Sequence, residues 1–190
     1  MAELDADGIE QFDRAIEQMQ PLLDDLLAAP KHTVADHPKV PSVAGVYLFS
    51  EDDRPIYVGQ SRKLSRRLRF HTSLTSRENQ ASFAFNIAKR EAGKVGLNIK
   101  RLRKALEPDP DFAEHFSQAK ERVRAMEVQF IGLEDPINRT IFEVYASLAL
   151  KTNRGVWTPA ARRAGVSEPP TRCATRTLRF AAGRARRSPN

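Results

Sequence analysis

The stretch that decides the fold lies at residues 45–71 and reads GVYLFSEDDRPIYVGQSRKLSRRLRFH. Two short apolar segments, at residues 45–50 and 55–59, flank a polar cluster of turn-forming residues, and this pattern predicts a β-hairpin. Ser61 then offers a good helix N-cap, and residues 62–71 have the composition of an arginine-rich helix. We therefore expect strand, turn, strand and basic helix to form one compact unit.

Each predicted strand carries a tyrosine, Tyr47 within Gly-Val-Tyr and Tyr57 within Tyr-Val-Gly, ten residues apart. Arg67 follows the second tyrosine by ten residues, and His71 follows by four more, so that Arg67 and His71 share a helix face. In these residues the chain resembles the GIY-YIG nuclease superfamily. The arginine-to-histidine spacing is similar to that of its restriction-enzyme-like branch.

The resemblance implies an α/β domain over residues 41–155, with a small three-stranded, mainly antiparallel sheet flanked by helices. It implies a DNA-cleaving site in which one glutamate holds a single Mg²⁺ or Mn²⁺ ion. Arg67 would contact the scissile phosphate, to which a guanidinium can offer two donors. Tyr47 would orient or deprotonate the attacking water, Tyr57 would bond the water or the phosphate, and His71 would bond or transfer a proton beside them. Taken alone, strand tyrosines usually pack and a helix histidine is usually structural.

Two glutamates compete for the metal. Glu127 begins a run that copies the ending of the family's pattern, but it lies in the alternating residues 126–132, which favour a third strand. Glu143 lies in the helix predicted over residues 137–150, after the strong start signal of Asp135-Pro136. In the family the glutamate is on the helix after the third strand, so Glu143 is the preferred ligand. Its alternative role is that of an ordinary exposed carboxylate.

The chain departs from the family's pattern in two places. Gln60 follows Tyr-Val-Gly where many relatives have lysine, so positive charge must come from other side chains. The family also has an asparagine about twelve residues after the glutamate, where this chain has Gly155, and Asn153 can substitute only if the chain is displaced. The residues expected to bind nucleic acid are Arg62, Lys63, Arg66, Lys100 and Arg101. Those expected to be structural are Gly45, Gly59 and Asn153.

The basic residues of segment 94–106 allow two interpretations, a surface that grips a phosphate backbone or the solvated side of a helix. Charge is otherwise concentrated at the chain's ends. Residues 1–150 hold 21 basic and 23 acidic side chains, whereas residues 151–190 hold 10 and 1. Residues 156–190 are therefore predicted to be a mostly disordered tail that either holds DNA or has no particular role.

The N-terminal segment at residues 1–40 is predicted to be an acidic amphipathic helix, over residues 8–28, followed by a proline-punctuated linker. That helix either packs on the domain edge or binds a partner. A single cysteine, Cys173, excludes an internal disulfide and a Cys-rich zinc site. Because there is no apolar run of about 18 residues and no signal-peptide pattern, we expect a cytoplasmic protein.

Together these features predict a metal-dependent endonuclease that acts on double-stranded or branched DNA in repair, recombination or restriction. Two other functions stay open. One is a nucleic-acid-binding module whose hydrolytic site has decayed, and the other is a protein-interaction module whose acidic first helix recruits partners.

Overall fold

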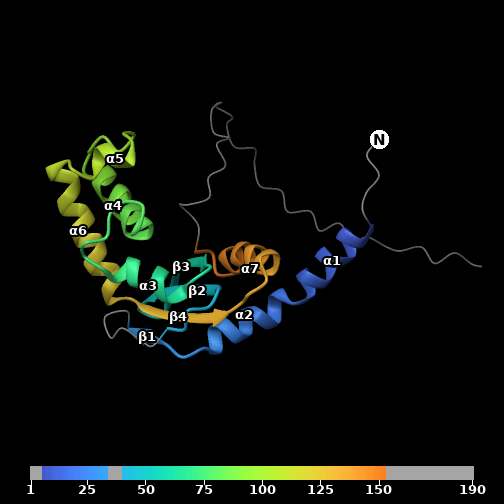
Figure 1. Cartoon of the computed structure of the whole chain (residues 1–190). Helices are drawn as coiled ribbons and strands as arrows, with labels where there is room; N and C mark the ends of the chain where they lie inside the picture. Colours follow the sequence, from blue (N-terminus) through green and yellow to red (C-terminus); the bar gives the residue numbers. More distant parts are fainter. Residues whose placement is uncertain (1–5, 34–39, 153–190) are drawn as a thin grey trace, which may run out of the picture. The chain divides into compact units, whose positions relative to one another are not determined.

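A four-stranded antiparallel sheet is built on the predicted hairpin in the computed structural model, which describes residues 6–33 and 40–152 (Figure 1). The strands are β1 (His32–Thr33), β2 (Gly45–Glu51), β3 (Arg54–Ser61) and β4 (Glu127–Gly132), in the spatial order β1-β4-β2-β3. The chain divides into the units Met1–Trp157 and Thr158–Asn190, and every described residue belongs to the first. The predictions for the tail therefore lie outside the described residues.

The hairpin turns through two aspartates, as the polar cluster predicted. Glu51 pairs with Arg54, which leaves Asp52 and Asp53 as a two-residue loop. Both aspartates have positive φ angles, of 50° and 59°. Two such residues give a turn whose twist matches that of the flanking strands, and aspartate is one of the few residues that tolerates this backbone region.

The sheet has four strands rather than the predicted three. His32 pairs with Val128 and Thr33 pairs with Glu127, so β1 is an edge strand inside the segment predicted to be a linker. The His32 ring also stacks on Phe130, with ring centroids 5.6 Å apart. Two residues are too few to show an alternating pattern in the sequence, and only the partner strand β4 makes them a strand.

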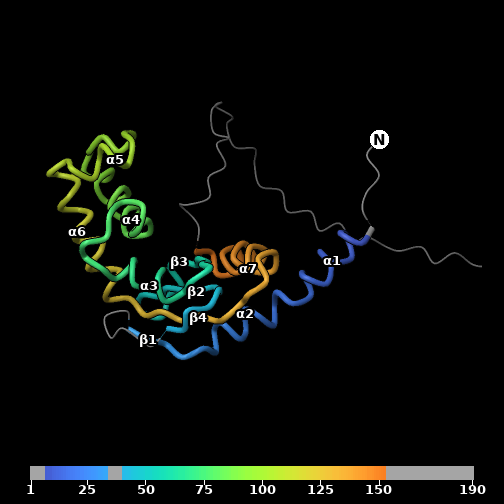
Figure 2. The backbone as a smooth tube through the Cα atoms, viewed as in Figure 1, coloured from blue at the N-terminus to red at the C-terminus, as the bar shows by residue number. Residues whose placement is uncertain are grey.

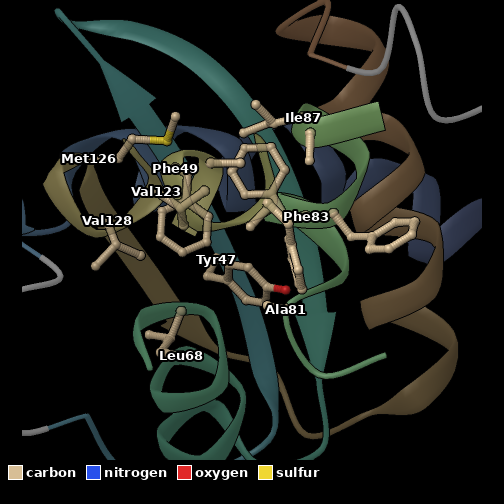
Figure 3. Close-up of a cluster of buried hydrophobic side chains, with 14 of the residues drawn as sticks. Tyr47, Phe49, Leu68, Ala81, Phe83, Ile87, Val123, Met126 and Val128 are labelled. Carbon is tan, nitrogen blue, oxygen red and sulfur yellow. The ribbon is translucent and has the colours of Figure 1, made fainter. Parts of the chain in front are cut away.

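Helices cover both faces of the sheet (Figure 1). They are α1 (Ala6–Glu17), α2 (Met19–Ala28), α3 (Leu64–Thr72), α4 (Ser82–Lys94), α5 (Arg103–Leu106), α6 (Pro110–Ala125) and α7 (Pro136–Ala149). On β2, Tyr47 and Phe49 join a buried cluster with α3, α4 and α6, part of which Figure 3 shows. Val46 and Leu48 face the other way, into a second cluster with α2 and α7. None of the helices in the described part of the chain is long and apolar enough to cross a membrane.

The predicted N-terminal helix is divided into α1 and α2 at Gln18. The two halves differ in packing, because α2 buries Met19, Leu23 and Leu26 in the cluster with α7. In contrast, α1 buries Ala15 but leaves its large apolar residues about half exposed, namely Ile9, Phe12 and Ile16. The expectation of a helix packed on the domain is therefore right for α2, whereas α1 contacts α7 but leaves most of its large apolar surface exposed.

Helix α3 begins later than predicted. Ser61 pairs with Gly45, so β3 continues through it, and α3 starts at Leu64 with Lys63 in the cap position. The Ser61 hydroxyl oxygen still accepts a hydrogen bond from the Lys63 backbone N–H, at 3.0 Å. Ser61 thus shapes the turn between strand and helix and is not the N-cap.

Helices α4, α5 and α6 form a hairpin-like insertion between α3 and β4 (Figure 2). The basic segment 94–106 is not one helix, because Gly96, with a φ of 87°, ends α4. The Leu97 N–H donates to the Ala92 carbonyl and the Gly96 N–H donates to the Gly93 carbonyl, at 3.0 and 3.2 Å. This pair of bonds is the Schellman motif, which requires a left-handed residue at the position of Gly96.

Candidate active site

The two glycines of the strand motifs allow close packing beside Tyr47. Tyr47 lies opposite Gly59, and a Cβ atom at Gly59 would lie only 2.5 Å from the Tyr47 Oη. At Gly45 a Cβ atom would meet Leu64 Cδ1 at 2.8 Å and would collide with the Ile131 carbonyl oxygen. Tyr47 is consequently enclosed, with 0% of its surface exposed.

Arg67 is held in place by three neutral oxygens. Its Nε donates to the Tyr47 Oη at 3.2 Å, its Nη1 donates to the Gln80 carbonyl at 3.1 Å, and its Nη2 donates to the Ser82 hydroxyl at 2.8 Å. A guanidinium has five N–H donors, so one remains on each terminal nitrogen. In the described part of the chain no carboxylate forms an ion pair with Arg67. Its positive charge is therefore uncompensated.

His71 lies on the other side of the Tyr47 hydroxyl, with 3.0 Å between its Nε2 and the Tyr47 Oη. The imidazole is completely buried beside the rings of Phe49 and Phe83, at centroid distances of 5.4 and 6.2 Å. Burial, and then the positive charge of Arg67, hold the pKa of His71 well below its usual range. The ring is therefore neutral at pH 7, and its Nδ1 has no partner among the described residues.

The two tyrosines differ in access to solvent. Burial raises the pKa of Tyr47, the nearby Tyr57 raises it further, and Arg67 only partly opposes this. Tyr57 is partly exposed, and its ring stacks on Phe83 with centroids 4.4 Å apart and 16° between the planes. Its pKa is raised by burial, is lowered in part by Arg67 and is raised again by Glu143. Tyr57, rather than Tyr47, reaches the surface, so Tyr47 cannot contact water directly in this arrangement.

Glu143 adjoins the hairpin through a hydrogen bond with Gln60. Helix α7 starts at the expected Asp135-Pro136 signal, with Asp135 as N-cap. The Gln60 Nε2 donates to the Glu143 Oε2 at 2.9 Å, and the Gln60 Oε1 accepts from the Arg139 Nε at 3.0 Å. Arg139 is buried and also donates to the Leu133 and Glu134 carbonyls. Gln60 thus links the candidate metal ligand Glu143 to the buried Arg139.

Glu127 lies elsewhere, at the start of β4, where it pairs with Lys31 at 3.0 Å. In the sheet it is opposite Ser50, which is three residues along β2 from Tyr47. Strand geometry makes that separation about 10 Å. Of the two candidate carboxylates, only Glu143 adjoins the end of β3 that leads into α3, the helix that carries Arg67.

The residues present fit a cation held by one carboxylate and do not fit a cage of ligands. No group of three or more His, Cys, Asp or Glu side chains in residues 6–33 and 40–152 could hold a metal ion. The Glu143 Oε1 accepts no hydrogen bond from these residues and is available as a ligand. Mg²⁺ commonly keeps several waters and takes one or two carboxylates together with substrate phosphates, which such a site allows.

Three of the predicted DNA-binding residues share a cavity with Arg67. This cavity, of about 360 Å³, is lined by Ser61, Arg62, Lys63, Arg66, Arg67 and Phe70. Arg66 lies over the Phe70 ring, 5.2 Å from its centroid. Four of the lining residues are cations, namely Arg62, Lys63, Arg66 and Arg67. We call this positively charged cavity the basic hollow.

Lys100 and Arg101 do not belong to this cavity. They lie in the turn between α4 and α5, where Arg101 donates to the Asp109 carboxylate at 2.5 Å and to the Ala105 carbonyl at 2.9 Å. Arg101 is thus already neutralised, and Lys100 is exposed. Both were expected to bind nucleic acid, and that expectation stays a prediction, but the structure places them apart from the residues that line the Arg67 cavity.

Sequence reasoning missed the groups that hold the site together. They are Gln80 and Ser82, which bind Arg67, Phe83, which stacks on Tyr57, and Arg139, which fixes Gln60. Nothing in their local sequence signals these contacts, since each joins segments far apart in the chain. Asn153, the expected polar anchor, lies outside the described residues.

Comparisons with known proteins add no relative. No family model, no curated protein and no solved structure matches the chain. The function therefore has to be argued from the geometry of the site and from the sequence pattern.

Proposed function

We propose that this chain is a divalent-metal-dependent DNA endonuclease of the GIY-YIG type. One observation carries the proposal. Arg67 is a partly buried guanidinium bound only to neutral oxygens, and it lines a cavity with three further cations. An uncompensated, pre-oriented guanidinium suits a phosphate, with which it can form two charge-assisted hydrogen bonds.

In this proposal Arg67 binds the non-bridging oxygens of the scissile phosphate with its two remaining N–H donors. Tyr47 binds Arg67 directly and His71 supports Tyr47, because the Tyr47 Oη accepts a hydrogen bond from the Arg67 Nε and lies 3.0 Å from the His71 Nε2. They keep the guanidinium in one orientation. Pre-oriented donors of this kind stabilise the charge that develops in the transition state.

Tyr57 is the tyrosine that reaches the substrate. Because burial and Glu143 raise its pKa, Tyr57 stays protonated at neutral pH. It therefore acts as a hydroxyl that orients the attacking water or donates to a phosphate oxygen, and not as a phenolate base. This assigns to Tyr57 the contact with water that the resemblance implies for Tyr47.

Glu143 would hold the metal ion through its Oε1, while Gln60 keeps the other carboxylate oxygen in place. A divalent cation there supplies an acidified water and neutralises charge on the phosphate. The basic residues Arg62, Lys63 and Arg66 would bind neighbouring phosphates.

One observation favours a second function, a nucleic-acid-binding module that does not cleave. Gln60 occupies one oxygen of Glu143 and is itself held by the buried Arg139. This arrangement resembles a carboxylate that forms structural hydrogen bonds within the protein. Only activity distinguishes the two functions.

The test uses supercoiled plasmid and branched oligonucleotides with Mg²⁺ or Mn²⁺. The parent protein should nick the DNA, and Arg67→Ala and Glu143→Ala should each abolish nicking. Arg122→Ala is the matched control, because Arg122 binds Glu51 at the far end of the hairpin. Cleavage that survives both site substitutions would reject the site, and binding without cleavage at any metal concentration would favour the second function.

A further inference from the structure

A second cavity, of about 420 Å³, adjoins Tyr57 and shares no lining residue with the cavity at Arg67. It is lined by Ile56, Tyr57, Phe83, Asn86, Ile87, Lys89, Arg90, Ile99 and Thr152. Its volume lies in the range of pockets that take small organic molecules. Neither the phosphate contacts nor the metal ligand proposed above uses it.

The cavity has an apolar interior with aromatic character. Ile56, Ile87 and Ile99 contribute aliphatic surface, and the Tyr57 ring, backed by its stacking on Phe83, contributes a rigid aromatic surface. Phe83 and Ile87 also belong to the buried cluster of Figure 3, so the wall is firmly anchored. Such a surface suits a flat, partly apolar ring.

Polar groups line the same cavity. The Asn86 Oδ1 accepts a hydrogen bond from the Arg103 Nη2 at 2.9 Å, which orients the amide and leaves its N–H donors for another partner. Lys89 forms no ion pair within the described part of the chain. Arg90 forms only a loose one there, 3.6 Å from its neighbour Glu91. The lining therefore offers amide donors together with two cations.

We infer that this cavity holds an unpaired nucleobase of the nucleotide next to the phosphate bound at Arg67. The inference rests on the proposed function. Tyr57 connects the two sites, because its ring lies 6.2 Å from that of Tyr47, which binds Arg67, and because Tyr57 also lines the cavity. Aromatic and aliphatic surface contacts the base, Asn86 binds the base edge, and Lys89 and Arg90 attract the flanking phosphates, a combination typical of single-stranded nucleic-acid binding.

The inference names a substrate class. A base within an intact duplex is stacked and paired, and moving it into a protein pocket costs unstacking energy, whereas an unpaired base costs little. The protein should therefore prefer DNA with a bulged, branched or single-stranded nucleotide over continuous duplex.

The test measures binding without metal, so that cleavage does not interfere. The full-length protein is titrated into three duplexes that differ at one position, where they carry a bulged 2-aminopurine, a bulged abasic residue or no bulge. We expect the 2-aminopurine duplex to bind about tenfold more tightly than the abasic one. Its fluorescence should change on binding, because the base moves into an aromatic environment.

Ile56→Trp should fill the cavity and is compatible with a β-strand position. The variant should bind the 2-aminopurine duplex no more tightly than the abasic duplex. Its affinity for the abasic duplex should equal that of the parent protein. Asn86→Leu, of similar size, should weaken the same preference even if Ile56→Trp does not fold. The control is Leu102→Trp, at a side chain that is 81% exposed and lies outside both cavities.

The outcomes separate this inference from the proposed function. Two results would overturn the inference alone, because the protein would still bind DNA. One is equal affinity for the 2-aminopurine and abasic duplexes. The other is a preference for the 2-aminopurine duplex that survives both cavity substitutions. Absence of binding to all three duplexes would overturn both.

Discussion

The two ends of the β2–β3 hairpin both gather charged side chains, but they treat the charge differently. At the turn end Lys31 and Arg122 both have acidic partners. Lys31 pairs with Asp53 and with Glu127, and Arg122 forms two hydrogen bonds with Glu51, of 2.7 and 2.6 Å. The open end is the opposite one, where Gly45 pairs with Ser61. There Arg67, on the following helix α3, binds only neutral oxygens.

The difference shows why cavity size is a poor guide to a site. The cavity at the turn end measures about 500 Å³ and the basic hollow about 360 Å³. In the larger cavity the one cation of the lining, Arg122, is bound to Glu51 and the other charged residues of the lining are acidic, so the cavity has little to offer an anion. In the smaller one a fixed positive charge lacks a counterion, and a bound phosphate would supply one.

The contrast between the two ends is tested most directly by a glutamate-to-glutamine substitution at each end. Glu143→Gln should lower the rate of metal-dependent DNA cleavage about 100-fold or more, since it removes the carboxylate whose charge acts on Tyr57 and would hold the cation. Plasmid nicking at a series of Mg²⁺ concentrations measures this.

Glu127→Gln is the matched change at the turn end. It should leave the nicking rate unaltered and cost at most about 1 kcal/mol of stability, because its partner Lys31 is a partly exposed lysine. If Glu127→Gln abolished nicking and Glu143→Gln did not, the metal ligand would be at the other end of the hairpin.

Packing at the open end can be tested with a pair of glycines. Gly59→Ala should destabilise the fold by about 1–3 kcal/mol, because the new Cβ would lie 2.5 Å from the Tyr47 Oη and the buried ring has little room to move. Chemical denaturation measures the loss.

Gly132→Ala provides the control, since its Cβ would lie 3.7 Å from the nearest atom, the Val43 Cγ2. We expect this variant to be about as stable as the parent. Equal stability of all three proteins would mean that Tyr47 can shift freely, which would contradict the fixed orientation assigned to Arg67.

The buried histidine gives the open end a dependence on pH. Since the pKa of His71 is well below its usual range in the folded protein, the unfolded chain binds the extra proton first as the pH falls. Its contribution to stability is complete above about pH 6.5 and declines below that, by up to about 1.4 kcal/mol per pH unit.

Denaturation midpoints between pH 8 and pH 5 would show this slope above the range in which carboxylates titrate. His71→Gln should flatten it, whereas His115→Gln, a change at a partly exposed histidine, should not. A slope that His71→Gln leaves unaltered would show that His71 already carries its proton at pH 7.

Parts of this structure could be predicted because their signals are local. The hairpin turn depends on two aspartates between apolar segments, and the start of α7 depends on the adjacent Asp135 and Pro136. The helix start places Glu143 on α7 but does not say where α7 packs, and the hydrogen bond from Gln60 shows that Glu143 adjoins the hairpin.

The remainder depends on contacts between distant segments. Strand β1 exists through pairing with β4, about 95 residues further along the chain. The groups that hold Arg67 lie on the approach to α4, and Tyr57 stacks on a phenylalanine of that helix. The local sequence pattern does not indicate which hydroxyl side chain will bind Arg67 or which aromatic ring will stack on Tyr57.

The smallest effect is expected from the pair that best represents the turn end, Glu51 and Arg122. Hydrogen bonds from Arg122 lower the pKa of Glu51, so the pair should stabilise the fold above about pH 4.3 and lose this effect as the pH falls through the lowered pKa. A double-mutant cycle with Glu51→Gln and Arg122→Gln should give a coupling energy of at most about 1 kcal/mol at pH 7, reduced by salt. DNA cleavage should not change in any of the three variants. A coupled loss of cleavage would mean that paired charges at this end of the hairpin serve the site, and the contrast between the two ends would no longer hold.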